Sequence, residues 1–334
     1  MRSTCFACLA GCLAILLSSP ASAQPAKGPK PMFVDDQKLF ADFMEKLTDF
    51  AKAGKPLDHE KLVARMKTGT KAKVTPTKAS DKALSPEEIY KLALPSVFIV
   101  GSVYKDKAGD WQDGVYATAW VASADGILVS NWHVFEDMEA GEVFGVVDHK
   151  GNVYPVIDVL GGDKVADVAI FRIDAKGLTP LAIADDYAPV GSWVGVLSHP
   201  GDNFYLYTTG TVTRYSTNKN DDGKKERWMG LTAEYAGGSS GSPVLNKYGA
   251  VVGMAALTLT LDSGDGGRQN GDMKPNPNPN PNRRRFVRGQ PPIAPAPREK
   301  PEVIEPPKPA PQVAIQMIIK MAVPGPTILK YLGK

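Results

Sequence analysis

The sequence has little cysteine, and none where a folded domain would use it. Its three cysteines, Cys5, Cys8 and Cys12, lie in a segment that we expect to be removed as a signal peptide. The mature chain then has no disulfide, no thiol and no cysteine-based metal site. Clusters of Asp, Glu and His with metal-ligand spacing are also lacking. The sequence therefore predicts a fold held by packing alone, with no metal and no cofactor.

A strong charge of one sign and long apolar runs are lacking too. The formal net charge is +3, and no basic helix or aromatic-basic stripe occurs, which argues against nucleic-acid binding. Beyond the first 23 residues, no stretch reaches the roughly 18 apolar residues of a membrane-spanning helix. With 43% hydrophobic and 22% charged residues, the chain can bury at least one large core.

Residues 1–23 have the features of a secretory signal peptide. Met1-Arg2 supplies the positive start, residues 6–17 the apolar region, and Ala21-Ser22-Ala23 an A-x-A cleavage site. We expect an exported protein, periplasmic or secreted. The alternative is a lipoprotein anchored at Cys12, but the apolar stretch before this cysteine is short.

Residues 24–84 predict a helical N-terminal extension that ends in a linker. Apolar side chains within 35–52 fall on one face of a helix, and a second, shorter helix is expected from about Asp58 to Gly69. Residues 71–84 are rich in Lys, Thr and Ser, which is typical of a linker. Two interpretations stay open: a helical hairpin packed on the next domain, or a propeptide or interaction arm.

Residues 85–262 alternate short apolar runs with turn residues. Ser85-Pro86-Glu87-Glu88 is a helix start with an N-cap and a capping glutamate. Strand-like runs follow at 97–100, 115–122, 127–129, 143–147, 153–159, 168–173, 193–197, 205–212, 228–232, 244–245 and 250–261. This pattern predicts an all-β barrel or sandwich.

Ser240 lies in a Gly/Ser-rich stretch, residues 234–243, that suits a nucleophile. A serine hydroxyl needs a tight turn, a general base, and backbone N–H donors for the developing oxyanion. Gly238 and Gly241 permit such a turn, and the amides of Gly238 and Ser240 are able to point at one spot. Taken alone, the stretch is as well explained by a plain turn between strands.

His133 and Asp167 are the two partners that such a serine requires. His133 closes an apolar run, and Asp167 begins another. Each residue alone is more often structural. The order His, Asp, Ser within one domain, each in its expected strand context, favours a catalytic triad. His59, His149 and His199 lie in polar or turn sequences and are left out of the site.

Three motifs resemble those of trypsin-like serine endopeptidases. Residues 238–243 resemble the G-x-S-G-G/S-P signature, residues 131–134 the T-x-x-H-V box, and residues 167–169 the D-[LIV]-A box. The sequence is most similar to the cysteine-free bacterial branch, the HtrA/Deg proteases and the glutamyl endopeptidases. This resemblance implies two six-stranded Greek-key barrels with the active site between them, His133 and Asp167 from the first and Ser240 from the second.

The resemblance also implies an activity. An exported endopeptidase would cleave proteins or peptides through an acyl-enzyme: Ser240 attacks, His133 transfers the proton, Asp167 orients His133, and the amides of Gly238 and Ser240 hold the oxyanion. The alternative is a catalytically inactive scaffold or binding protein that acts through its Pro-rich loop, although an intact triad argues against it. Ser239 stands where the vertebrate branch has an activating Asp, so no zymogen switch of that kind is expected.

The substrate pocket implied by the resemblance has two walls, Glu234 to Gly237 and Ala255 to Leu257. Small walls favour a small aliphatic residue before the scissile bond. A Glu234 carboxylate pointing inward would favour Lys or Arg instead, whereas Glu234 facing water would not. Glutamyl endopeptidases place a histidine where this chain has Ala255, which argues against glutamate specificity.

Residues 263–312 differ in composition from the rest of the chain. Residues 264–312 hold 13 of the 28 prolines, which predicts a solvated, disordered insertion. Residues 313–334 resemble the closing strand and C-terminal helix of the family, so they are expected to complete the protease domain, without a PDZ domain. The basic residues within 283–288 suit an acidic surface or cell-wall polymer, and a spacer without a partner is the alternative.

Overall fold

The computed structural model describes residues 31–57, 59–68, 72–75, 77–136, 141–220, 222–262 and 315–333. The predicted signal peptide, the insertion 263–312 and its basic residues at 283–288 lie outside these ranges. The chain divides into two units, Met1–Phe33 and Val34–Lys334, and the helices and strands among the described residues belong to the second. Within the described ranges, no helix has the length and apolar character needed to cross a membrane.

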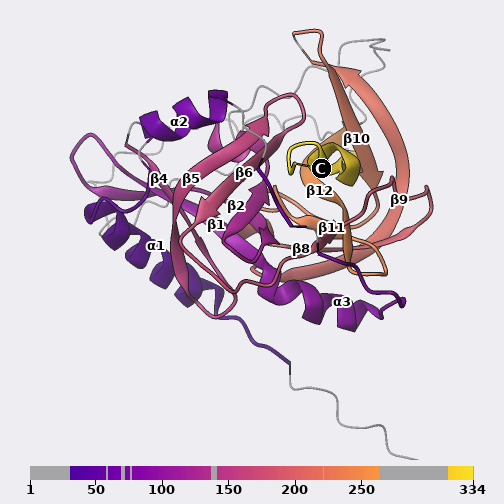
Figure 1. The fold of residues 1–334 in the computed structure, drawn as a ribbon, viewed down its shortest axis with the longest axis horizontal. Coiled ribbons are helices and arrows are strands. Elements are labelled where there is room, and N and C mark those ends of the chain that lie inside the picture. The colour runs from indigo at the N-terminus through magenta and orange to yellow at the C-terminus, as the bar shows by residue number, and fades with distance from the viewer. Residues whose placement is uncertain are drawn as a thin grey trace, which may run out of the picture. The chain divides into compact units, whose positions relative to one another are not determined.

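The first barrel is a closed sheet of six antiparallel strands. Their order around the barrel is β1-β2-β3-β6-β5-β4. Figure 1 labels β1, β2, β4, β5 and β6 of this barrel. Apolar side chains from successive strands fill its interior, including the fully buried Leu128, Phe144 and Phe171. The strands are β1 (Val97–Lys105), β2 (Trp111–Ser123), β3 (Ile127–Ser130), β4 (Val143–Val147), β5 (Val153–Asp163) and β6 (Val168–Ile173).

The second barrel repeats the same strand order. Its sheet runs β11-β8-β9-β10-β13-β12, and pairing of β11 with β12 closes it. The short β7 (Ala182–Ile183) adds parallel to β12. The six strands are β8 (Trp193–Ser198), β9 (Leu206–Lys219), β10 (Lys225–Leu231), β11 (Pro243–Leu245), β12 (Ala250–Asp262) and β13 (Ile315–Pro324). The predicted fold class, two six-stranded barrels, is confirmed.

Strand β13 lies between β10 and β12, although residues 263–314 separate it from β12 in the chain. The two strands form one antiparallel pair in which Asp262 stands opposite Ile315 and Gly253 opposite Pro324. Helix α4 (Gly325–Leu329) follows directly. Asp262 and Ile315, which flank the intervening segment, are therefore adjacent at one end of this strand pair.

The N-terminal extension packs on the barrels. Helix α1 (Asp36–Lys52) contacts β1, β4 and β5, and α2 (His59–Thr68) contacts β5. Helix α3 (Pro86–Ala93) begins with the capping box of Ser85 and Glu88 that the sequence predicts. The segment expected to be a linker is also anchored, because the amides of Ser80 and Leu84 donate to carbonyls of residues 247–248.

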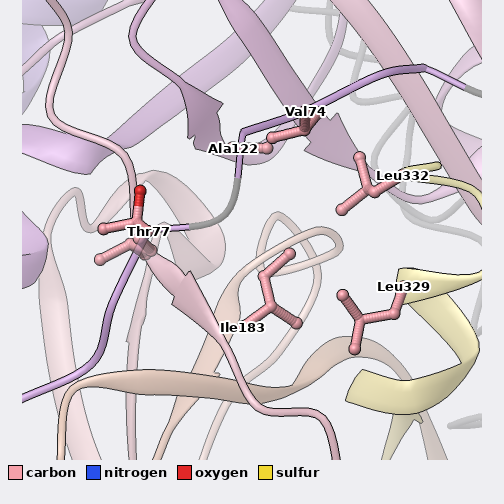
Figure 2. Close-up of a pocket in the computed structure, with 7 residues that line it drawn as sticks. Val74, Thr77, Ala122, Ile183, Leu329 and Leu332 are labelled. Atoms are coloured by element: carbon pink, nitrogen blue, oxygen red, sulfur yellow. The ribbon is translucent and has the colours of Figure 1, made fainter. Parts of the chain in front are cut away.

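A small apolar cavity of about 20 Å³ marks where the extension, the first barrel and the C-terminal helix meet (Figure 2). Its lining comes from segments that are far apart in the sequence, namely Val74, Thr77, Ala122, Leu181, Ile183, Leu329 and Leu332. Close by, the Ala72 amide donates to the carbonyl of Tyr331. Val74 and Thr77 therefore line the same apolar cavity as Leu329 and Leu332 near the end of the chain.

Candidate active site

The first barrel brings His133 and Asp167 together through paired strands. His133 lies in a short 3-10 helix, Trp132–Phe135, directly after β3, and Asp167 lies directly before β6. Strands β3 and β6 pair with Ser130 opposite Ala169, so the two side chains leave neighbouring strand ends. Asp167 has a φ of 53°, a left-handed conformation that is uncommon outside glycine and that often marks functional sites.

Hydrogen bonds fix the orientation of the His133 ring. Its Nδ1 lies 2.9 Å from Oδ2 and 3.0 Å from Oδ1 of Asp167, and the His133 amide donates to the same Oδ1 at 3.0 Å. The Asn131 side-chain amide donates to the Asp167 carbonyl at 3.0 Å. Because the carboxylate accepts from Nδ1–H, the lone pair of the neutral ring is on Nε2, as a general base requires.

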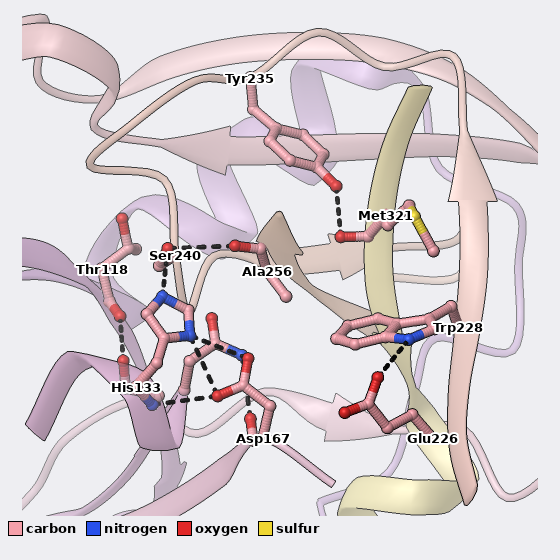
Figure 3. Close-up of polar contacts among 11 residues, drawn as sticks. Thr118, His133, Asp167, Glu226, Trp228, Tyr235, Ser240, Ala256 and Met321 are labelled. Atoms are coloured by element: carbon pink, nitrogen blue, oxygen red, sulfur yellow. Dashed lines mark hydrogen bonds and ion pairs between the residues drawn. The ribbon is translucent and has the colours of Figure 1, made fainter. Parts of the chain in front are cut away.

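The second barrel supplies Ser240, in the turn before β11. Its Oγ lies 2.9 Å from His133 Nε2 and 3.3 Å from the carbonyl oxygen of Ala256 on β12 (Figure 3). Ser240 is 9% exposed, whereas 39% of the His133 side chain is accessible. The three candidate residues thus form a continuous line of hydrogen bonds from one barrel to the other.

Thr118 of β2 connects the barrels beside Ser240, and sequence reasoning missed it. Its amide donates to the Ser240 carbonyl at 2.8 Å, and its Oγ1 donates to the Gly238 carbonyl at 3.0 Å. Ser130 Oγ in turn donates to the Thr118 carbonyl at 2.7 Å. A threonine within a strand-like run has no sequence signal that would reveal this position.

The loop before Ser240 has the backbone geometry that suits oxyanion binding. Gly238 has a φ of 95°, and a Cβ atom there would lie 2.3 Å from the His199 carbonyl oxygen, so only glycine fits. The Gly237 carbonyl accepts from the Gly201 amide at 2.9 Å, and in a trans peptide the next N–H points the opposite way. Within the described residues, neither the Gly238 nor the Ser240 amide is seen to donate to a protein acceptor.

His199, which the sequence analysis left out of the site, is fully buried behind this loop. Its Nδ1 accepts a hydrogen bond from the Tyr205 amide at 3.0 Å. Burial lowers the pKa of His199 to about 3, so the ring is neutral at physiological pH. The ring supports the segment that contacts Gly238 and has no contact with the His133 and Ser240 side chains among the described hydrogen bonds.

The residues predicted to form the two walls of the substrate pocket lie in the loop before Ser240 and on β12. Ala255 is fully buried, with its amide and carbonyl bonded to Ser242 and Gly241, while Leu257 is 38% exposed. The Glu234 side chain is 75% exposed, and its Oε2 lies 3.0 Å from Nζ of Lys320 on β13. Glu234 therefore faces largely toward water, one of the two orientations that the sequence left open.

Comparison with known proteins finds a family model, curated relatives and a solved structure that are similar to parts of this chain. Residues 117–254 match the family model of the trypsin-like peptidase domain. A probable periplasmic serine endoprotease DegP-like from Chlamydia pneumoniae is 31% identical over 157 residues, 47% of this chain and 31% of that protein. The putative serine protease HhoB of Synechocystis is 27% identical over 141 residues, covering 41% and 33%. A serine endoprotease structure from Yersinia pestis has a TM-score of 0.42 at 20% identity, covering 54% and 60%.

Residues 117–254 are thus similar to trypsin-like peptidase domains, and the curated relatives that the chain matches are named as serine proteases. Several of these relatives are probable periplasmic serine endoproteases described as DegP-like. The chain spans about a third of the length of the curated relatives that it matches.

Proposed function

We propose that the protein is an exported serine endopeptidase that hydrolyses peptide bonds in proteins through an acyl-enzyme. One observation carries the proposal: Asp167, His133 and Ser240 are joined by hydrogen bonds of 2.9 Å on each side of the imidazole. This arrangement forms only when both barrels are folded and in contact. It is the arrangement in which Ser240 can act as nucleophile, His133 as general base and Asp167 as the carboxylate that orients the base.

In the first half of the reaction, Ser240 Oγ forms a bond to the carbonyl carbon of the substrate while its proton passes to His133 Nε2. The carbonyl electrons move to the oxygen, which the Gly238 and Ser240 amides stabilise. Asp167 stabilises the imidazolium. His133 then protonates the leaving nitrogen, the carbon–nitrogen bond breaks, and an ester remains on Ser240.

In the second half, His133 takes a proton from water, whose oxygen attacks the ester carbon. Collapse of this second tetrahedral intermediate breaks the bond to Ser240 Oγ, which recovers its proton from His133. The substrate acid leaves and the resting site is restored. The Ala256 carbonyl near Ser240 Oγ lies on the strand where an extended substrate would bind.

Export to the periplasm is part of the proposal. It rests on the signal peptide predicted at residues 1–23 and on the similarity to several endoproteases that are described as periplasmic. A mature chain without cysteine gains no stability from the oxidising conditions there, so its folding depends on packing.

A fluorophosphonate probe tests the activity. Because the probe reacts with an activated serine, we expect labelling of the full chain at Ser240, located by mass spectrometry of the digested protein. Ser240→Ala should abolish labelling. A folded wild-type protein that takes no label would refute the peptidase function and support the inactive scaffold.

A further inference from the structure

Lys320 is a buried lysine on β13, with only 6% of its side chain exposed. Its Nζ donates to the Tyr235 carbonyl at 2.6 Å, lies 3.0 Å from Glu234 Oε2, and lies 5.6 Å from the centre of the Tyr235 ring. An ammonium group withdrawn from water is costly unless such partners compensate it. A buried charge of this kind therefore needs a reason beyond packing.

The position of Lys320 relative to Ser240 follows from the strand register. Lys320 stands opposite Thr258, two residues beyond Ala256, whose carbonyl oxygen lies 3.3 Å from Ser240 Oγ. From β13 the side chain reaches the Glu234–Tyr235 segment, which leads into the Ser240 loop. The ammonium therefore contacts one predicted wall of the substrate pocket, at Glu234 and Tyr235, and its strand pairs with β12, which carries the other wall.

The two partners of Lys320 differ in how firmly they are held. Tyr235 is buried, and its hydroxyl donates to the Met321 carbonyl at 2.7 Å, so its backbone is fixed next to β13 (Figure 3). The Glu234 side chain is 75% exposed, and an exposed carboxylate gains little from one ion pair. Glu234 is therefore replaceable by another carboxylate, because it returns to water without leaving a buried charge unpaired.

A carboxylate of the substrate could replace Glu234 as the partner of Lys320. It would enter between the walls, pair with Lys320 Nζ and displace Glu234 into solvent. A substrate Lys or Arg would instead meet the ammonium of Lys320 in a partly desolvated site, where like charges repel strongly. The charge on Lys320 Nζ would therefore favour acidic substrate side chains over basic ones.

Resting on the proposed peptidase function, we propose that Lys320 is a specificity-determining residue that selects substrates with Asp or Glu immediately before the scissile bond. The alanine at position 255 means only that β12 lacks the histidine with which glutamyl endopeptidases bind a glutamate side chain. In this chain the cation comes from β13, the strand that follows the insertion.

Matched peptide substrates test the proposal. Fluorogenic peptides that differ only in the residue before the scissile bond, Glu, Asp, Ala, Val or Lys, are compared by kcat/KM with the full chain. We expect Glu or Asp to exceed Lys by at least tenfold. Lys320→Met should lower kcat/KM for Glu by about 10- to 100-fold, as expected for loss of a charge-assisted contact, and that for Ala by less than about threefold.

Three further variants separate specificity from structure. Lys320→Arg should keep much of the acidic preference, and Glu234→Gln should raise kcat/KM for Glu severalfold because the competing carboxylate is gone. Lys330→Met, at an exposed lysine after α4, is the matched control and should change nothing. If Lys320→Met is too unstable to assay, the exposed Glu234 position still decides: an unchanged or lower value for Glu would contradict the exchange.

The outcomes also distinguish this proposal from the proposed function. A chain that takes the fluorophosphonate label but prefers Ala, Val or Lys refutes the acidic specificity alone. An equal loss on all substrates in Lys320→Met would make Lys320 a support for Tyr235 rather than a selector. A folded chain without label at Ser240 would overturn both proposals.

Discussion

A Cβ atom on Gly101 of β1 would lie 2.5 Å from Cε1 of Phe43 on α1. The helix therefore packs directly against the strand backbone, as the fully buried side chains of Phe43 and Leu47 also indicate. A Cβ on Gly145 of β4 would likewise meet Leu47, at 2.6 Å. This packing is the kind found inside a domain core, and it favours the packed helical hairpin over a removable propeptide.

Leu47→Ala should destabilise the protein by about 2 to 5 kcal/mol, because it removes buried methyl groups and leaves a cavity against β4. The free energy of unfolding in urea, followed by tryptophan fluorescence, measures the effect. Glu45→Ala, on the exposed side of α1, is the control and should change stability by less than about 0.5 kcal/mol. Equal effects at both positions would contradict the core role of α1.

Removal of the extension should weaken the fold and not activate the enzyme. A chain of residues 85–334 would expose the strand surfaces that α1 and α2 cover, so we expect a lower melting temperature and no gain in kcat/KM over residues 24–334. Thermal unfolding and peptide hydrolysis are measured in parallel. A large gain in activity with the fold intact would establish inhibition by the extension.

Ser240→Ala should lower kcat on the order of 10⁶-fold with the fold intact, because the residual rate comes only from binding and oxyanion stabilisation. Asp167→Asn should cost about 10⁴-fold, since an amide holds the wrong tautomer of His133. Ser192→Ala, in a turn before β8, is the serine control. Retention of most activity in Ser240→Ala would show that the triad assignment is wrong.

Stability should fall in acid because of His199. Burial lowers its pKa to about 3 from the ordinary 6.5, so between these values the unfolded state binds a proton that the folded state does not. The contribution of His199 to the free energy of unfolding is fully present above pH 6.5. It is lost as the pH decreases toward 3, by at most about 1.4 kcal/mol per pH unit.

The variant His199→Asn keeps an acceptor for the Tyr205 amide but does not titrate. Its unfolding free energy, measured in urea from pH 7 to pH 4, should therefore depend less on pH than that of the wild type. His149→Asn serves as the comparison, since partial burial also lowers the pKa of His149 and its effect should be smaller. If the unfolding free energy of His199→Asn depends on pH as steeply as that of the wild type, His199 is not the cause of the acid destabilisation.

Replacement of residues 264–312 by a short Gly/Ser turn should leave hydrolysis of small peptides within a few fold. The pairing of Asp262 with Ile315 allows a tight connection, and loop-closure entropy changes only slowly with length. Cleavage of, or attachment to, large targets should change. A deletion variant that fails to fold would show that β13 depends on the segment before it.

Local patterns predicted most of the strands, because turn residues and apolar runs are encoded within a few neighbouring positions. The candidate triad could be proposed from the sequence because His133, Asp167 and Ser240 each lie in a short motif. Thr118 and Lys320 were missed for the opposite reason: their partners lie far away in the sequence, and only the strand register brings them together. Anchoring of the 71–84 segment was missed for the same reason, since polar composition does not reveal backbone hydrogen bonds to a distant turn.

The late position of β13 in the chain affects how the protein is made. During synthesis, β10 and β12 emerge well before β13, and until residues 263–314 have been translated both strands have an open edge. Open edges of this kind invite pairing with other chains, so the nascent protein passes through a stage at which it depends on protection from aggregation. Lys320 lies on β13, the strand that covers both open edges.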